Sequence, residues 1–355
     1  MVLLRVNFFE IYKLKGVIIL ANATYGIDMG TSTIKIYNSV NDQVTMEKNM
    51  IAIANKTQLF AYGDSAFDMY EKAPGNIQIT FPLNNGVIAD IKNMQLLLKN
   101  FMNDVEGDNV KPADYYVAVP TDITEVEKRA FYDVVRESDI KARRIWMVEK
   151  AVADGLGLDI DVKNSQGVMI VDVGYHTTEI SIISLGGIVL SRLIKIGGLK
   201  FDEAIRNMIR KEFGLFIGEK SAEHMKESLS ELISQGENAL VYGRDIVMGL
   251  PVEREIPTDM INASMKECFD MIIDNVRVIL ERTPPELSAD IFRKGLYLTG
   301  GASQVYGLGE LLSKGTGLKV NACEHAAESV ALGLSRIIKE DNFKSVAYTV
   351  EGMRK

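Results

Sequence analysis

The chain has 355 residues, of which 47% are hydrophobic and 25% charged, so it is long enough to form two domains with sizeable cores. Its formal net charge of −8 and the lack of a Lys/Arg block disfavour a general nucleic-acid-binding protein. Cys268 and Cys323 lack paired spacing and the three histidines are scattered, which disfavours a metal motif. No run of about 18 apolar residues is present, so no membrane-spanning helix is expected.

Residues 1–24 form an extension ahead of the first motif. The extension is mostly apolar, with Arg5, Lys13 and Lys15 as cations, but on a helix its polar positions scatter around the axis. Glu10 and Lys13 also interrupt the apolar region that a signal peptide needs. Three interpretations stay open: an interfacial membrane anchor, an added structural segment, and a start codon assigned too far upstream.

A phosphate-binding hairpin is predicted at residues 25–37, where two apolar strands flank a tight turn of Gly30, Thr31, Ser32 and Thr33. Glycine lets the backbone come close to a ligand, and such a turn can point several N–H groups at a phosphate. Asp28 at the strand end can hold a hydrated Mg²⁺ ion, and Lys35 can add a positive charge. The hairpin alone is also compatible with an ordinary β-turn.

The same pattern recurs about 145 positions later. An apolar run ends at Asp172, passes Gly174, Thr177 and Thr178, and enters another alternating strand. A third stretch, residues 296–303, is a strand that runs into a diglycine turn and suits a ring packed against bare backbone. Two hairpins and this turn favour a duplicated domain with a nucleotide between its halves.

Longer stretches carry a resemblance to a known family. They include Val126-Glu127-Lys128-Arg129-Ala130, Gly197-Gly198 followed by Lys200-Phe201-Asp202-Glu203, and Glu281-Arg282-Thr283-Pro284-Pro285-Glu286-Leu287. Together with the order of the three loops, they resemble the MreB family of bacterial actins, within the superfamily of actin, sugar kinases and heat-shock chaperones. The resemblance runs from about Tyr25 to about Ile338.

The resemblance implies an α/β, actin-like fold of the duplicated ribonuclease H type, with two lobes around a nucleotide cleft. It places lobe I at residues 25–150 and 325–340, with a subdomain inserted at about 53–85. Lobe II is expected at residues 151–324, with a subdomain inserted at about 199–250. Residues 341–355 are expected to form a weakly ordered tail.

The resemblance also implies ATP and Mg²⁺ as cofactors, with Asp28 and Asp172 holding the metal through water. The phosphates are expected at Gly30, Thr31, Ser32, Thr33, Lys35, Gly174, Thr177 and Thr178. The nucleoside is expected at Gly198, Glu223, Lys226, Gly300, Gly301 and Ala302. Glu223 and Lys226 are equally compatible with a surface ion pair on one helix face.

Hydrolysis of ATP is implied with Glu127 orienting the attacking water, assisted by Asp172 and Thr177. The chain departs from the family where Tyr175 and His176 replace two glycines of the second phosphate loop. This change either shifts the loop or weakens contact with the γ-phosphate. His176 is interpreted either as a new base or phosphate ligand, or as a side chain that points outward from the turn.

The resemblance implies an ATP-dependent filament of double protofilaments that assembles from copies of this chain. Such filaments are expected in the cytoplasm at the inner face of the membrane, where they organise cell-wall (peptidoglycan) synthesis with its partner proteins and so determine cell shape. The alternative is a nucleotide-binding structural filament with little or no ATP hydrolysis. A chaperone-like or sugar kinase-like ATPase is a further alternative.

Overall fold

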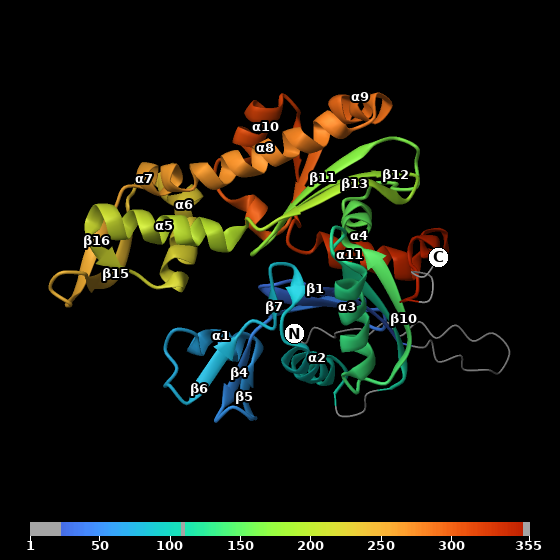
Figure 1. The fold of residues 1–355 in the computed structure, drawn as a ribbon, viewed down its shortest axis with the longest axis horizontal. Coiled ribbons are helices and arrows are strands. Elements are labelled where there is room, and N and C mark those ends of the chain that lie inside the picture. The colour runs from blue at the N-terminus through green and yellow to red at the C-terminus, as the bar shows by residue number, and fades with distance from the viewer. Residues whose placement is uncertain (1–22, 108–110, 351–355) are drawn as a thin grey trace, which may run out of the picture.

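The computed structural model describes residues 23–107 and 111–350, and the residues 1–22 of the predicted extension lie outside this range. Two five-stranded sheets, one in each half of the chain, form its frame (Figure 1). Within the described residues, none of the helices combines the length and apolar content needed to cross a membrane.

The first sheet has the strand order β10-β9-β1-β2-β3. Its strands are β1 (Thr24–Met29), β2 (Thr33–Asn38), β3 (Gln43–Lys48), β9 (Ala113–Val119) and β10 (Ala142–Glu149). β1, β9 and β10 are parallel, and every residue of β9 is buried, as expected for a strand covered on both faces. The helices α2 (Ile91–Glu106) and α3 (Glu125–Glu137) pack with this sheet around one apolar core.

The second sheet repeats this plan with the order β13-β12-β11-β17-β18. Its strands are β11 (Val168–Val173), β12 (Thr178–Ser184), β13 (Gly187–Ile194), β17 (Leu296–Thr299) and β18 (Val320–Ala322). The outer helices of this half are α8 (Lys266–Arg282), α9 (Pro285–Lys294) and α10 (Leu308–Thr316). In each sheet the central parallel strand continues through a hairpin into its antiparallel neighbour, β1 into β2 and β11 into β12.

Two helices rich in small residues cross between the sheets, α4 (Lys150–Gly157) and α11 (Ser329–Lys339) (Figure 1). Their apolar residues form a third core cluster with side chains from both sheets. Gly157 and Gly333 bring the two backbones together, since a Cβ on Gly157 would lie 1.8 Å from the Ser329 carbonyl oxygen. The chain therefore passes between its halves through one tightly packed crossing.

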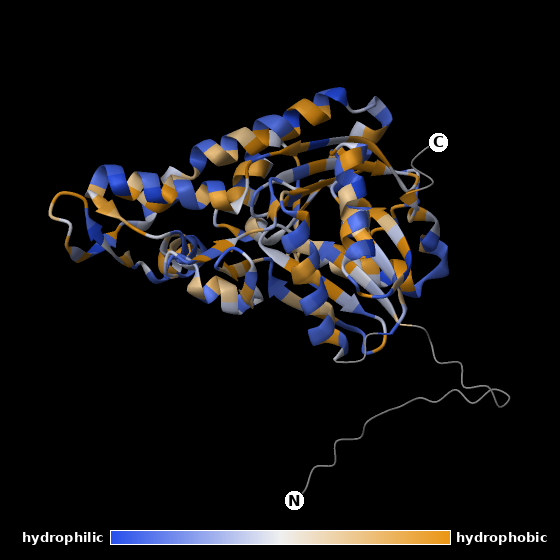
Figure 2. Cartoon of the chain, turned by 60° about the horizontal axis from the view of Figure 1, so that its bottom comes forward, coloured by the Kyte–Doolittle hydropathy of each residue, from blue (hydrophilic) through white to orange (hydrophobic). Residues whose placement is uncertain are grey.

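Smaller elements extend from each half. The first half carries α1 (Gly63–Met69), β4 (Ile51–Ala54), β5 (Gln58–Tyr62), β6 (Ile77–Thr80), β7 (Leu83–Asn84) and β8 (Val87–Ile88). The second carries α5 (Gly198–Phe213), β14 (Leu215–Phe216), α6 (Glu219–Gln235), β15 (Ala239–Asp245), β16 (Pro251–Ile256) and α7 (Thr258–Ser264). Figure 2 shows apolar residues along the central strands and at the tip of the β15–β16 hairpin, where Val247 is exposed.

The segment after α11 is ordered as far as the described chain extends, so the prediction of a weakly ordered tail is wrong for residues 341–350. A 3₁₀ helix, η2 (Asp341–Val346), buries Phe343 against the crossing helices. Tyr348 then pairs with Met147 of β10 through two backbone hydrogen bonds of 2.7 and 2.9 Å. Apolar burial and these hydrogen bonds hold the segment in place.

Candidate functional site

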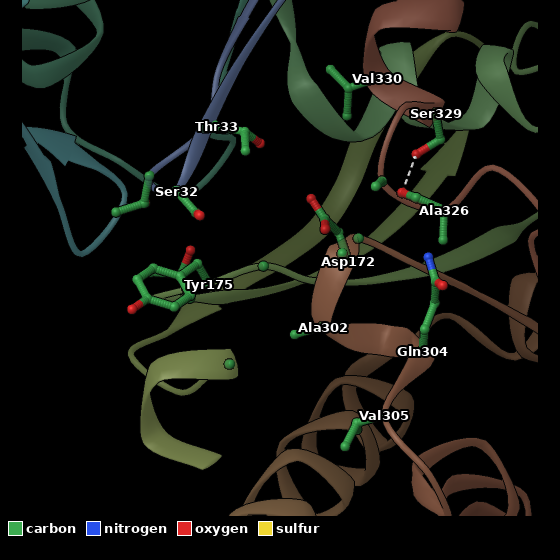
Figure 3. Close-up of a pocket in the computed structure, with 18 of the residues that line it drawn as sticks. Ser32, Thr33, Asp172, Tyr175, Ala302, Gln304, Val305, Ala326, Ser329 and Val330 are labelled. Atoms are coloured by element: carbon green, nitrogen blue, oxygen red, sulfur yellow. Dashed lines mark hydrogen bonds between the residues drawn. The ribbon is translucent and has the colours of Figure 1, made fainter. Parts of the chain in front are cut away.

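The two hairpins and the diglycine turn meet at one cleft between the halves, with a cavity of about 540 Å³. Figure 3 shows Ser32 and Thr33 on one side of this cavity, Ala302 and Gln304 on the other, and Asp172 between them. All of the predicted site residues except two line it: Asp28, Gly30, Thr31, Ser32, Thr33, Lys35, Asp172, Gly174, Thr177, Gly198, Glu223, Lys226, Gly300, Gly301 and Ala302. The sequence motifs therefore describe one site.

Glycine is required where the loops approach each other most closely. A Cβ on Gly300 would lie 2.1 Å from Oδ1 of Asp172, and its φ of +88° is in the region that favours glycine. The N–H of Gly300 donates to the Ala326 carbonyl, 2.9 Å away. Bare backbone at this turn keeps the wall of the cavity flat beside the carboxylate of Asp172.

Each of the two carboxylates predicted to hold a metal is paired with a lysine. Lys35 Nζ lies 3.0 Å from Oδ2 of Asp28, and Lys150 Nζ lies 2.7 Å from Oδ2 of Asp172. Burial alone would raise the pKa of Asp28, but Lys35 and Lys150 outweigh burial and hold this pKa below its ordinary value. Burial lowers the pKa of Lys150, but Asp172, Asp28 and Glu179 more than compensate and raise it.

Both carboxylates belong to the donor type that Mg²⁺ prefers, and they face the same cavity, so they fit a hydrated ion held through water. Among the residues that the structure describes, no group of three or more Asp, Glu, His or Cys side chains is placed to hold a metal directly. A magnesium ion here would be held through water by Asp28 and Asp172 and would supply positive charge to bound phosphates.

Two predicted residues do not line the cavity. The carboxylate of Glu127 accepts hydrogen bonds from the backbone N–H and the hydroxyl of Thr124, each at 2.7 Å, in a capping box at the start of α3. Thr178 is fully buried and donates from its hydroxyl to the Ile196 carbonyl at 2.8 Å. In this structure both side chains hold secondary structure together.

Glu223 and Lys226 do not pair with each other. Lys226 is buried and lies 2.8 Å from Asp202, whose pKa is raised to about 7, chiefly by burial. Glu223 lies 3.9 Å from Lys48, which comes from the opposite half of the chain. The interpretation of an exposed ion pair on one helix face is therefore wrong, and both residues face the cleft.

Tyr175 and His176 join the two halves across the cleft. We call Phe81, Asn85, Tyr175 and His176 the interlobe clasp. The Phe81 ring centroid lies 5.8 Å from that of Tyr175 and 6.1 Å from that of His176, and Tyr175 stacks on His176 at 5.1 Å. The backbone N–H of Asn85 donates to Nδ1 of His176 at 3.2 Å. Burial lowers the pKa of His176, which favours the neutral ring that accepts this bond.

The structure places His176 and Tyr175 between the two halves of the chain. His176 is buried against the other half, so the interpretation that it points outward is wrong, and it is not among the residues that line the cavity. Tyr175 donates from its hydroxyl to Glu219 at 2.6 Å, and its carbonyl accepts from the N–H of Leu199 at 2.8 Å. The rings of Tyr175 and His176 thus pack against Phe81 of the other half, and Tyr175 also lines the cavity.

A second cavity of about 30 Å³ adjoins the first and is large enough for a water molecule. Asp28, Lys150, Asp172 and Thr177 line both cavities, and Glu179 lines only the smaller one. Glu179 accepts hydrogen bonds from the backbone N–H and the hydroxyl of Thr121. Burial raises the pKa of its carboxyl to about 7, although Lys150 and Thr121 oppose this shift.

Glu179 is expected to make the unfolding free energy depend on pH. Its folded pKa of about 7 lies above the ordinary 4.5, so this contribution to stability is complete below pH 4.5 and is lost as pH rises through 7. The loss is on the order of 3 kcal/mol. Urea unfolding at pH 5 and pH 8 should show this loss of unfolding free energy in the wild type. Glu179→Gln should lack the part of the loss that comes from Glu179. Equal pH dependence in both proteins would contradict the assignment; Asp202 contributes equally to each.

Lys150 and Glu179 are site residues that the sequence analysis missed. Lys150 directly follows β10, which is parallel to β1 and β9, and ligands commonly bind at the carboxyl ends of such strands. A lysine at this position was therefore a usable signal. Glu179 had no such signal, because its hydrogen-bond partner Thr121 lies 58 positions away in the sequence.

Comparisons with known proteins agree with this architecture. A family profile described as MreB/Mbl protein matches residues 22–345. The cell shape-determining protein Mbl of Bacillus subtilis is 35% identical over 313 residues, 87% of this chain and 93% of that protein. The crystal structure of MreB 5 of Spiroplasma citri bound to AMPPNP is similar with a TM-score of 0.85 and 35% identity, covering 92% of this chain and 98% of that one.

The MamK double helical filament shares the fold, with a TM-score of 0.74 and 21% identity over 90% of this chain and 99% of that one. The predicted actin-like fold of two lobes is confirmed by these structures, and so is the predicted resemblance. We therefore use lobe I and lobe II for the halves that contain the first and second sheets. The chain belongs to the MreB/Mbl family.

Proposed function

We propose that this protein is an ATP-binding, actin-like filament protein that determines cell shape. The observation that carries the proposal is the convergence of both phosphate hairpins and the diglycine turn on one cavity of about 540 Å³. The phosphate end of this cavity carries the charged side chains of Asp28, Asp172 and Lys35. The opposite wall is backbone suited to the nucleoside and consists of Gly300, Gly301 and Ala302. A hydrated Mg²⁺ ion would be held by Asp28 and Asp172 and would supply positive charge to the phosphates.

We propose that copies of the chain assemble into double protofilaments, and membership in the MreB/Mbl family supports this proposal. The place of action that we propose is the cytoplasmic face of the cell membrane, where the filaments organise peptidoglycan synthesis with partner proteins. The nucleotide is proposed to couple to assembly because the cleft that holds it lies between the lobes. Binding there favours one relative position of the lobes, and a filament selects subunits in one such position.

A structural filament with little ATP hydrolysis is the second candidate, and one observation favours it. The carboxylate of Glu127, the residue expected to orient the attacking water, is engaged by Thr124 in the capping box of α3. General-base catalysis needs an acceptor within hydrogen-bond reach of the water or connected to it by one water molecule. Binding without turnover fits this arrangement.

Sedimentation of the purified protein with ATP, ADP or no nucleotide tests the proposal when phosphate release is recorded in the same samples. We expect a pellet that requires nucleotide, because we propose that nucleotide binding favours the lobe position that assembles. Pelleting with phosphate release supports an ATPase filament, and pelleting without release supports the second candidate. Failure to pellet under every condition, with liposomes included, would contradict the filament function and favour a kinase-like protein.

A further inference from the structure

A pocket of about 440 Å³ lies in lobe I and shares no lining residue with the nucleotide cleft. We call it the basic pocket. Its lining comes from β1, β9, β10, α11 and η2 and consists of Thr24, Asp114, Tyr116, Arg143, Arg144, Trp146, Ile338 and Lys344. Two arginines and one lysine stand against a single carboxylate, so the lining carries a net charge of +2. The basic pocket is therefore suited to an anion.

A β-bulge in β10 brings two neighbouring arginines to one carboxylate. Side chains of successive strand residues normally point to opposite faces of a sheet. The pairing of β10 with β9 shifts between Ala142 and Arg144, so Arg143 is the extra residue of a bulge. Nε of Arg143 lies 2.8 Å from Oδ1 of Asp114, and Nε of Arg144 lies 3.1 Å from Oδ2. Both guanidinium groups are therefore held side by side.

Asp114 positions the two guanidinium groups and leaves them able to bind a ligand. Burial raises the pKa of Asp114, but the hydrogen bonds and charges of Arg143 and Arg144 outweigh burial and hold this pKa below its ordinary value. Among the described residues, Asp114 is the only acceptor of hydrogen bonds from the two arginines. The side chain of Arg143 is 37% exposed and that of Arg144 61%. Each planar fork carries further N–H donors, which an anion in the pocket can use.

The third cation belongs to η2. Lys344 pairs with Asp341 at 2.5 Å, and the side chain of Asp341 is 90% exposed. An exposed ion pair of this kind contributes little to stability, so Lys344 can turn to a bound anion at small cost. The positive charge of Arg144 acts on Lys344, which places the third cation near the arginines. Phe343, buried beside Lys344 in the chain, holds this part of η2 against the crossing helices.

Two aromatic rings form the apolar part of the pocket. Trp146 and Tyr116 are cross-strand partners, and their rings are stacked with centroids 6.3 Å apart. Tyr116 is buried, whereas Trp146 is half-buried. An indole of this kind offers an amphipathic surface to the organic part of a ligand. The basic pocket thus combines cationic donors with an aromatic wall.

A phosphate group matches these donors better than a carboxylate does, because it offers more acceptor oxygens to the two guanidinium forks and the ammonium. We propose that the basic pocket binds the phosphate group of a phosphate ester, with the organic part of the ester against the indole of Trp146. A soluble ester and a phospholipid headgroup share this chemistry. Such a site goes beyond the proposed nucleotide-binding function, since the cleft contributes none of its lining.

Trp146 is the only tryptophan of the chain, so its fluorescence reports on the basic pocket. The full chain is titrated without nucleotide, first with glycerol 3-phosphate and then with vesicles of phosphatidylglycerol or of phosphatidylcholine. We expect a saturable change in fluorescence with the soluble ester or with phosphatidylglycerol, and a weaker response at high salt. Saturation by glycerol 3-phosphate would support a soluble ligand. A response to phosphatidylglycerol vesicles alone would support a lipid headgroup.

Two substitutions test the cations of the pocket. Lys344→Gln removes one cation without touching Asp114, and Arg144→Gln removes another while Arg143 still pairs with Asp114. Each should raise the half-saturating concentration by about tenfold or more, the effect of losing one charge-assisted hydrogen bond. Lys99→Gln is the matched control, because Lys99 is 44% exposed and Lys344 46%, and each pairs with an exposed aspartate. The control should bind as the wild type does.

The proposal would be overturned if the wild type showed no saturable response to either phosphate compound. Equal affinities of Lys344→Gln and Lys99→Gln would also overturn it, and Arg144→Gln decides the matter if Lys344→Gln fails to fold. Binding of phosphate in the nucleotide cleft would not separate these variants, because Lys344 lines only the basic pocket. Polyglutamate that binds as tightly as the phosphate ester would overturn the preference for phosphate and indicate an acidic peptide.

Discussion

Alanine at Gly157 or Gly333 is expected to destabilise the protein by about 3 kcal/mol or more, because overpacked sites cost this much when the neighbours cannot move. A Cβ on Gly333 would lie 1.6 Å from the Ala153 carbonyl oxygen, and one on Gly157 would lie 1.8 Å from that of Ser329. Both obstacles are helix backbone, so relief requires α4 and α11 to separate. Separation would open the core cluster that both sheets share. Alanine normally favours a helix over glycine by about 1 kcal/mol, which is too little to offset this clash.

Thermal unfolding monitored by circular dichroism measures this effect. Gly309→Ala is the matched control, because Gly309 also lies in a helix, α10, but its Cβ would meet only ordinary contacts at 3.7 and 3.9 Å. The control should unfold at or slightly above the wild-type temperature. If Gly157→Ala and Gly309→Ala behaved alike, the close helix crossing would be incorrect.

Replacing both Tyr175 and His176 by glycine is expected to speed nucleotide release by about tenfold or more, since each 1.4 kcal/mol of lost interaction is a factor of ten. The double substitution removes the ring contacts to Phe81 and the acceptor for the Asn85 N–H from the interlobe clasp. Aromatic pairs contribute about 0.5–1.5 kcal/mol each beyond their buried area. With these interactions absent, the lobes should open more readily around the cleft.

Stopped-flow displacement of a fluorescent nucleotide measures this release rate. Tyr175→Phe is a graded control, because it keeps the ring that faces Phe81 and removes only the 2.6 Å hydrogen bond to Glu219 within lobe II. Its release rate should stay close to that of the wild type. A double variant that releases nucleotide at the wild-type rate would show that the clasp does not hold the lobes together.

A feature of this site can be predicted from the sequence when the residues that form it lie close together in the chain. Asp28 and Asp172 each sit at the end of a strand whose hairpin is encoded within a few residues, so motif and structure coincide. The clasp was missed because His176 finds its partner at Asn85, 91 positions earlier in the chain. Glu127 was predicted to act in the cleft, yet its near neighbour Thr124 also forms a capping box with it, and the sequence does not rank these two uses.

The burial of charged groups was equally hard to predict. Glu223 lies three residues before Lys226 on a helix, so the spacing is compatible with an ion pair at the surface. Its partner is Asp202, on a different helix, and the pair is buried. Helical spacing identifies which residues share a face, but tertiary packing decides whether that face meets water or another element.

The pairing of Tyr348 with Met147 has a consequence for how the chain avoids unwanted association. β10 is the outer strand of its sheet, and an unpaired outer strand offers a template to strands of other molecules. Tyr348 occupies part of that template, and its hydroxyl donates to Glu149 at 2.8 Å. A protein that ends before residue 341 would leave this part of the β10 edge unpaired. Edge-to-edge pairing between β10 strands of different molecules is then expected to compete with ordered assembly. The last described residues thus cover part of the edge strand of the lobe I sheet.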